Sequence, residues 1–310
     1  MESELKKNFN ILVLDGGGSK GIYTLGLLNE LEKRLGHTLD QKFDLIYGTS
    51  TGSIIASLIA LGYDIQSIKE LYLENIPNIM TAKGKKNKSL ALKNLADEIF
   101  KDLTFDDFKT DIGIVSLNYD TQNPLIFKSN IKQSHGMKHS FIPGFGCKIS
   151  DAVQSSCSAY PIFDVKIINT LNQGNINAID GGFIANNATL YALVDADKAF
   201  KVPHNNIRVL SVGTGSFVEK PIKGWMKLFK YFKILKFVER ILNSSTNSNV
   251  ILSKILYPHI KILRLNDTFN EPDYGTNMVE TDMNKLETLY KLGRDTYARN
   301  ESEIESILAD

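Results

Sequence analysis

Short apolar runs alternate along the chain with longer segments in which apolar residues recur every three or four positions. The short runs end at glycine or other turn residues and predict buried β-strands, whereas the longer segments predict helices with one apolar face. Strands are predicted over residues 10–14, 43–47, 112–117, 124–128, 177–180, 210–212 and 261–265. Helices are predicted over residues 22–35, 53–61, 62–80, 90–100, 150–158, 188–200, 221–242 and 283–308. This alternation of strands and helices predicts an α/β protein.

The first two predicted strands and the helix between them form a βαβ unit. The crossover in such a unit is right-handed, and its two strands are parallel and end at the same edge of the sheet. The first strand ends at the sequence Asp15-Gly-Gly-Gly-Ser-Lys-Gly21, and the second ends at Gly48-Thr-Ser-Thr-Gly52. We therefore expect the two glycine motifs to lie side by side, where open α/β sheets bind their ligands.

The motif at residues 48–52 predicts a nucleophile elbow. A G-x-S-x-G sequence between a buried strand and a buried helix places the serine, Ser50, on a sharp turn with its hydroxyl exposed. Gly48 and Gly52 are favoured because the chain passes close to itself on either side of this turn. The helix that follows directs its N-terminal amides toward the site, where they can stabilise an oxyanion. Taken alone, the motif also fits a tight turn in a protein core.

The glycines of the first loop have two interpretations. Backbone amides of residues without side chains can face a phosphate or an oxyanion. Gly16, Gly18 and Gly21 also match G-x-G-x-x-G, which is typical of dinucleotide-binding folds. Such a fold needs an acidic residue near the end of the second strand to hold the ribose, and this chain has Ser50 there instead. Nucleotide binding by this loop is therefore the weaker alternative.

An aspartate followed by two glycines, Asp180-Gly181-Gly182, is the candidate partner of the serine. A triad in the order serine, aspartate, histidine would need His204 or His259, but both precede predicted strands. We expect them at the edge of the sheet opposite Ser50. A carboxylate can take the serine proton directly if burial raises its pKa. We therefore predict that Asp180 is the base, although an Asp-Gly-Gly turn is common at protein surfaces.

Composition and charge exclude several classes of protein. The 310 residues are 43% hydrophobic and 23% charged, with a formal net charge of +1 at pH 7, so no general affinity for nucleic acid is expected. Cys147 and Cys157 are too few for a disulfide framework, and the N-terminus lacks the apolar region of a signal peptide. We expect a cytoplasmic protein with reduced cysteines. No apolar run approaches the roughly 18 residues that a membrane span needs.

Two basic segments are candidates for contact with an anionic membrane surface. Residues 83–88 form a lysine-rich stretch that predicts a solvent-exposed loop. Residues 221–242 carry lysine or arginine at spacings of three or four, with Trp225 and other apolar residues between them. That pattern is typical of an amphipathic helix in a membrane interface, and also of a helix that packs on the domain with a solvated basic face. A peripheral contact with a membrane is the expectation that follows.

In combination, the three motifs resemble those of the patatin-like phospholipase family. Asp15-Gly-Gly-Gly-Ser-Lys-Gly21, Gly48-Thr-Ser-Thr-Gly52 and Asp180-Gly-Gly182 occur in the order and at the spacing of that family, and residues 156–161 and 211–215 also resemble it. The resemblance is strong over residues 8–215 and loose beyond them. We expect a patatin-like catalytic core over residues 8–215 and a C-terminal helical region over residues 216–310 that completes the same domain.

The resemblance implies a three-layer α/β/α fold with a mainly parallel central sheet and a Ser-Asp catalytic dyad. Carried over position by position, it implies Ser50 as nucleophile, Asp180 as base, and Gly16, Gly17 and Gly18 as the oxyanion loop, supported by Asp15, Lys20, Gly21, Gly48, Thr51, Gly52, Gly181 and Gly182. Many members have arginine at the position of Lys20, and lysine keeps the charge without the bidentate guanidinium. The implied activity needs no calcium, other metal or cofactor. Bacterial members include secreted toxins and antiviral effectors that cyclic nucleotides activate.

The sequence therefore predicts a lipid acyl hydrolase of the phospholipase A type. Ser50 would attack an ester carbonyl, the loop amides would bind the oxyanion, and Asp180 would activate water to release the acyl group from the enzyme. A carboxylesterase or acyltransferase of soluble esters is the alternative with the same chemistry, and a non-catalytic nucleotide-binding protein is the alternative without it. The expected partner is a phospholipid or other acyl lipid at a membrane surface, and the sequence specifies neither a regulatory ligand nor an oligomeric state.

Overall fold

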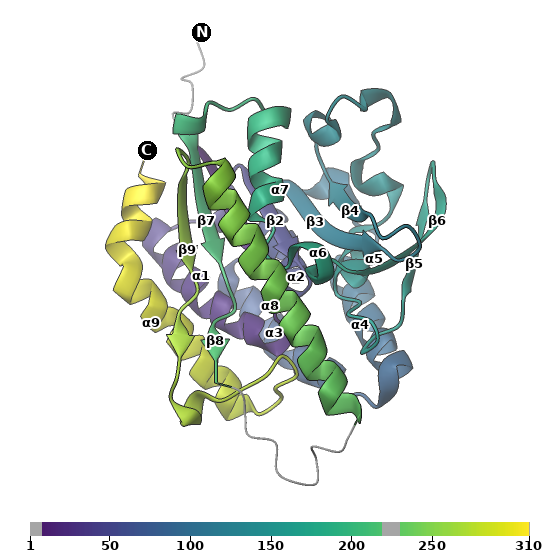
Figure 1. The fold of residues 1–310 in the computed structure, drawn as a ribbon, viewed down its shortest axis with the longest axis vertical. Helices are drawn as coiled ribbons and strands as arrows, with labels where there is room; N and C mark the ends of the chain where they lie inside the picture. Colours follow the sequence, from purple (N-terminus) through teal and green to yellow (C-terminus); the bar gives the residue numbers. More distant parts are fainter. Residues whose placement is uncertain (1–7, 219–229, 310) are drawn as a thin grey trace.

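A central β-sheet lies between two layers of helices in the computed structural model, which describes residues 8–218 and 230–309 (Figure 1). The strands follow the order β5-β6-β3-β2-β1-β7-β9, and β4 pairs with β3 outside this path. Their bounds are β1 (Phe9–Leu14), β2 (Leu45–Thr49), β3 (Asp111–Asn118), β4 (Pro124–Lys128), β5 (Lys166–Thr170), β6 (Gly174–Asp180), β7 (Ile207–Val212) and β9 (Lys261–Leu265). A separate short pair consists of β8 (Ser216–Phe217) and β10 (Thr268–Phe269).

The sheet is mainly parallel, as the sequence predicts. Strands β3, β2, β1, β7 and β9 run in one direction, whereas β4 and β6 are antiparallel to β3 and β5 is antiparallel to β6. Both faces of β1 are buried: Leu12 and Leu14 belong to one apolar cluster, and Ile11 and Val13 belong to the other. A strand covered on both faces needs this uninterrupted apolar sequence.

The helices that cover the sheet are α1 (Gly21–Leu35), α2 (Thr51–Ala60), α3 (Ile65–Thr81), α4 (Gly84–Phe100), α5 (Ile149–Ser156), α6 (Gly182–Ala185), α7 (Thr189–Val194), α8 (Lys230–Leu256) and α9 (Met283–Leu308). Figure 1 shows α6, α7 and α8 on the face toward the viewer and α1, α3 and α9 behind the sheet. Helix α5 packs against α2, the helix that follows the elbow. The three-layer α/β/α fold is thus confirmed.

Two local features differ from the predictions. The lysine-rich stretch is not a loop, because α4 begins at Gly84 and includes it. Lys88 is buried there, and its ammonium donates to the carbonyls of Ile79 and Met80 near the C-terminal end of α3, which attract a positive charge. Strand β5 was not predicted, whereas β9, which joins the main sheet after residue 215, lies where the strand over residues 261–265 was predicted.

Helix α8 covers part of the basic segment predicted over residues 221–242. The helix continues beyond that segment to Leu256, and residues 221–229 lie outside the described part of the chain. Leu235, Val238 and Leu242 face the core, whereas Lys233 and Phe237 are exposed. Across residues 8–218 and 230–309, no helix combines the length and the apolar composition needed to cross a bilayer.

Candidate active site

The two glycine motifs lie next to each other at one edge of the sheet, as the βαβ unit predicts. Leu14 at the end of β1 is the register partner of Gly48 in β2. The approach beyond the strand ends is so close that a side-chain carbon on Gly16 would lie 2.9 Å from Cβ of Ser50. Only a residue without a side chain fits between the loop and the elbow at this point.

The elbow has the strained geometry that its sequence predicts. Ser50 has φ 52° and ψ −128° between β2 and α2. A side-chain carbon on Gly48 would lie 2.4 Å from the Gly52 carbonyl oxygen, and one on Gly52 would lie 2.3 Å from the Leu14 carbonyl oxygen. These contacts explain both glycines of the motif, because any larger residue would force the turn open.

A serine on α5 holds the backbone of the elbow. The amide of Ser50 donates to Oγ of Ser156 at 2.8 Å, and that hydroxyl donates to the carbonyl of Val115 on β3 at 2.6 Å. The strained turn is thereby tied to the neighbouring strand through one buried side chain. Ser156 was part of the sequence resemblance but had no predicted role.

Ser50 and Asp180 meet in a direct hydrogen bond. The Ser50 hydroxyl donates to Oδ2 of Asp180 at 2.7 Å, and the amide of Gly182 donates to Oδ1 at 2.7 Å. Strand β6 delivers the aspartate from the far side of β3, where Asp180 pairs with Ser116. Gly181 is needed beside it because a side-chain carbon there would lie 2.2 Å from the Val115 carbonyl oxygen.

The carboxyl group of Asp180 has an unusual environment. Its residue is 0% exposed, and this burial raises the pKa of the carboxyl to about 7, although the hydrogen bonds from Gly182 and Ser50 act in the opposite direction. Removal from water disfavours the charged form of a carboxyl group more than these donors favour it. A proton acceptor with a pKa near neutrality is well suited to general base catalysis.

The glycine loop presents unused backbone donors beside the serine. The side-chain amide of Asn186 donates to the Gly16 carbonyl at 3.1 Å, and this fixes the plane of the peptide that carries the Gly17 amide. Within the described residues, the amides of Gly17 and Gly18 have no protein acceptor. Gly18 has φ 56°, a conformation that favours glycine. Two free amides beside a nucleophile can bind an oxyanion.

Two hydroxyls hold the other side of this loop. The Thr51 hydroxyl donates to the Gly18 carbonyl at 3.2 Å, and the Tyr72 hydroxyl from α3 donates to the same oxygen. Gly21 begins α1 against Thr51, where a side-chain carbon would lie 2.5 Å from Cγ2 of the threonine. Thr51 therefore links the elbow to the glycine loop.

Asp15 carries a network that the sequence did not indicate. Arg264 on β9 binds the Asp15 carboxylate through both terminal guanidinium nitrogens, and Nη1 lies 2.9 Å from Oδ1. The side-chain amide of Asn187 donates to the same Oδ1 at 2.7 Å and to Oγ of Ser211 at 2.8 Å. These contacts fix the start of the glycine loop to the strand β9 and to the segment that follows Asp180.

Lys20 faces α8 instead of the glycine loop. Its ammonium lies 3.2 Å from Oε1 of Glu239, and both side chains are largely buried. Leu242 on the same helix lies close to Gly182, because a side-chain carbon added at Gly182 would lie 2.5 Å from Cδ2 of the leucine. The amide of Asn186 donates to Oγ of Ser245 at 3.2 Å. Helix α8, which crosses the sheet face in Figure 1, is therefore attached to two of the three motifs.

The two candidate histidines lie away from this constellation. His204 precedes β7, next to the start of β1, and its Nε2 lies 3.3 Å from Oδ1 of Asp197. His259 is exposed immediately before β9. Both are at the strand entrances, as predicted. Across residues 8–218 and 230–309, histidine, cysteine and carboxylate side chains form no group of three that could hold a metal ion.

Comparison with known proteins places these features in a family. A family model described as "Patatin-like phospholipase" matches residues 12–193. A protein of Escherichia coli named cUMP-AMP-activated phospholipase is 44% identical over 298 residues, which are 96% of this chain and 93% of that protein. A Pseudomonas aeruginosa protein named cGAMP-activated phospholipase is 29% identical over 219 residues, which are 66% of this chain and 62% of that protein.

A solved structure supports the same fold. The crystal structure of VipD from Legionella pneumophila superposes with a TM-score of 0.54 and covers 96% of this chain and 67% of VipD. The sequence identity is 12%, so the likeness concerns the fold alone.

Proposed function

The chain belongs to the patatin-like phospholipase family of lipid-hydrolysing enzymes, and we propose that it cleaves fatty acyl esters of phospholipids with Ser50 as nucleophile and Asp180 as base. The observation that carries this proposal is the 2.7 Å hydrogen bond from the serine hydroxyl to a fully buried carboxylate. The sharp turn at Ser50 supports the same assignment, as do the amides of Gly17 and Gly18, which have no acceptor among the residues that the structure describes.

The proposed reaction has two halves that use the same groups. Oγ of Ser50 attacks the ester carbonyl carbon while Oδ2 of Asp180 takes the hydroxyl proton, and the amides of Gly17 and Gly18 bind the oxyanion. The intermediate collapses, the lysolipid leaves with the proton from Asp180, and an acyl-serine ester remains. Asp180 then takes a proton from water, the resulting hydroxide equivalent attacks the acyl-serine, and Ser50 recovers its proton as the fatty acid departs.

Release of free fatty acid from phospholipid vesicles in the presence of a calcium chelator tests this proposal. Ser50→Ala and Asp180→Asn should each abolish nearly all release, and the double variant should lose no more than either single variant because the two residues act as a unit. His204→Ala is the matched control and should retain activity. Substantial release by Asp180→Asn, or loss of release in His204→Ala, would contradict the dyad.

A soluble short-chain ester distinguishes the alternative substrate class. A phospholipase should hydrolyse vesicles or micelles better than a monomeric ester, whereas a carboxylesterase should show no gain when its substrate aggregates. The outward face of α8 supports the membrane substrate, because Lys233, Phe237 and Arg240 are exposed there. A helix with basic and aromatic residues on its free face is suited to an interface with anionic lipid.

We further propose that a cyclic dinucleotide activates the hydrolase. The supporting observation is the 44% identity with the cUMP-AMP-activated phospholipase, which extends over 96% of this chain. Addition of cyclic UMP–AMP should increase fatty acid release by wild type and leave Ser50→Ala inactive. Equal release with and without the nucleotide would contradict this part of the proposal while leaving the hydrolase assignment intact. The division into a core over residues 8–215 and a completing region over residues 216–310 stays a prediction.

A further inference from the structure

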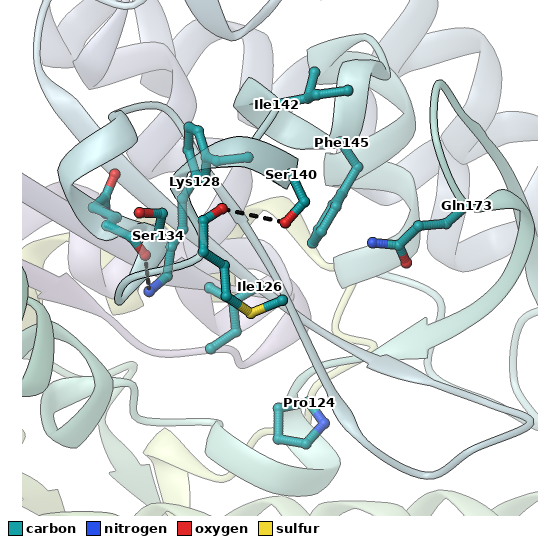
Figure 2. Close-up of a pocket in the computed structure, with 11 residues that line it drawn as sticks. Pro124, Ile126, Lys128, Ser134, Ser140, Ile142, Phe145 and Gln173 are labelled. Carbon is teal, nitrogen blue, oxygen red and sulfur yellow. Dashed lines mark hydrogen bonds between the residues drawn. The ribbon is translucent and has the colours of Figure 1, made fainter.

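A cavity of about 290 Å³ lies beside β4, and its lining contains no residue of the three motifs. The segment from residue 131 to residue 146, which follows β4, forms most of its wall. Figure 2 shows Lys128 and Ser134 on one side of the cavity and Phe145 with Gln173 on the other. The cavity is therefore a concave site in the described part of the chain whose lining does not include the dyad.

The walls combine apolar surface with a few polar groups. Ile126, Ile142 and the ring of Phe145 supply apolar contacts, whereas Ser134 and Gln173 supply a hydroxyl and an amide. Small-molecule sites typically have this composition. An aromatic ring beside an amide suits a planar heteroaromatic group, which can stack on the ring and form hydrogen bonds at its edge.

One of these polar groups has no partner. Ser134 is 9% exposed, and its Oγ is buried without a hydrogen-bond partner among the residues that the structure describes. Burial of a hydroxyl without a hydrogen bond is unfavourable, and native proteins rarely leave one in this state. In its present side-chain position the hydroxyl is closed to solvent, so a ligand atom in the cavity can supply the missing partner only after the Ser134 side chain turns toward it.

The segment around the cavity is basic. Residues 128–141 include three lysines and two histidines and contain no aspartate or glutamate. The Lys128 ammonium lies 2.6 Å from Oδ1 of the buried Asp195, whereas Lys132 and Lys138 are exposed. Lys138 is adjacent to Met137, which lines the cavity. Positive charge at the rim of an apolar pocket favours a ligand whose ring enters the pocket and whose phosphate stays at the rim.

We propose that this cavity binds one nucleoside of a nucleotide activator, with the phosphodiester at the basic rim. The proposal rests on the proposed activation by a cyclic dinucleotide and assigns it a place in the fold. A volume of about 290 Å³ is small for a ligand site, so one half of a dinucleotide enters the cavity and the other half lies on the rim.

A buried polar network joins the cavity to the elbow. Gln133, which lines the cavity, donates to Oδ2 of Asp195 at 2.9 Å, and the Tyr47 hydroxyl donates to the same oxygen at 2.5 Å. Tyr47 lies on β2, three residues before Ser50. Asp195 begins a π-helical turn, Asp195–Ala199, and such turns often occur at functional sites. A ligand that contacts Gln133 or Lys128 therefore acts on a side-chain cluster attached to the strand that ends in the nucleophile.

Calorimetric titration of the full chain with cyclic UMP–AMP, without lipid, tests the site. Gln173→Glu and Gln173→Lys place opposite charges at the same exposed position. We expect Gln173→Glu to bind the nucleotide about threefold more weakly than wild type and Gln173→Lys about threefold more tightly. A factor of about three is what one interaction between exposed charges typically contributes. Ser140→Trp, which places a large ring at the rim, should weaken binding at least about tenfold. Gln41→Glu, the same substitution away from the cavity, is the control and should bind like wild type.

Several outcomes would contradict the proposal that the nucleotide binds in this cavity. They are the absence of nucleotide binding by wild type, binding that none of the three variants alters, and changes of the same sign in both Gln173 variants. Binding of oleate with the expected variant dependence, in place of the nucleotide, would identify a lipid pocket instead. The melting temperature of each variant verifies its folding, and the Gln173 pair retains the test if Ser140→Trp does not fold. A failure of the hydrolase proposal is distinguishable, because it would appear as intact nucleotide binding without fatty acid release.

Discussion

The buried carboxyl of Asp180 should make the protein less stable as the pH rises, and Asp180→Asn should remove that dependence. The folded-state pKa is about 7, whereas the ordinary value of the group is 3.8. Below about pH 4 the carboxyl is protonated in both the folded and the unfolded chain. Between about pH 4 and pH 7 the unfolded chain releases its proton and the folded chain keeps it, so stability is lost with rising pH. A difference of about 3 pKa units corresponds to about 4 kcal/mol.

Urea unfolding followed by circular dichroism, at one-unit steps from pH 4 to pH 8, measures this effect. The free energy of unfolding of wild type relative to Asp180→Asn should fall by about 4 kcal/mol over the range. Other titrating groups cancel in the comparison, and the fixed cost of burying an amide beside Ser50 does not vary with pH. Ser50→Ala is the control, since it keeps the carboxyl and should retain the pH dependence. A constant difference between wild type and Asp180→Asn at all pH values would refute the raised pKa.

Three further predictions concern two supports of the site and the exposed face of α8. Arg264→Met should lower kcat on a soluble ester and lower the free energy of unfolding in urea by about 3 kcal/mol, because it leaves the Asp15 carboxylate buried without its cation. Adding Asp15→Asn to the same chain should restore part of the stability. No restoration would argue against an uncompensated buried charge. Gly52→Ala should lower the free energy of unfolding by about 2 kcal/mol and remove most of the activity, because the added carbon meets the carbonyl oxygen of Leu14. A melting temperature equal to that of wild type would show instead that the turn can widen. Lys233→Glu should reduce hydrolysis of anionic vesicles more than hydrolysis of a soluble ester, and equal losses would remove the proposed membrane contact of α8.

The parts of the site that were predictable from the sequence depend on short stretches of chain. The elbow and the glycine loop each follow from a strand, a set of glycines and a helix within a few residues. Their adjacency follows from the handedness of one βαβ unit. The partnership of Ser50 with Asp180 was predictable only because both motifs are distinctive and because the histidines precede strands instead of following them.

The missed features depend on contacts between distant segments. Arg264 is an ordinary residue of a short strand, and nothing near it in the sequence indicates that it binds Asp15, 249 positions earlier. Lys20 looks like a loop residue until α8 brings Glu239 beside it. The lysine-rich stretch before Leu90 was predicted as a loop from its charge, yet the free carbonyls of α3 make a buried position for Lys88. Charge patterns alone do not reveal such partners.

The order in which the residues of the proposed catalytic site occur along the chain has a consequence for biosynthesis. Ser50, the proposed nucleophile, emerges from the ribosome first. Asp180, the proposed base, follows 130 residues later, and Arg264, which binds Asp15 at the start of the glycine loop, emerges later still. Strand β3 must also lie between β2 and β6 before the serine and the aspartate can meet. A nascent chain interrupted before β9 therefore lacks Arg264 and its contact with Asp15, and one interrupted before β6 lacks Asp180. We therefore expect incomplete translation products to lack part of the proposed catalytic site.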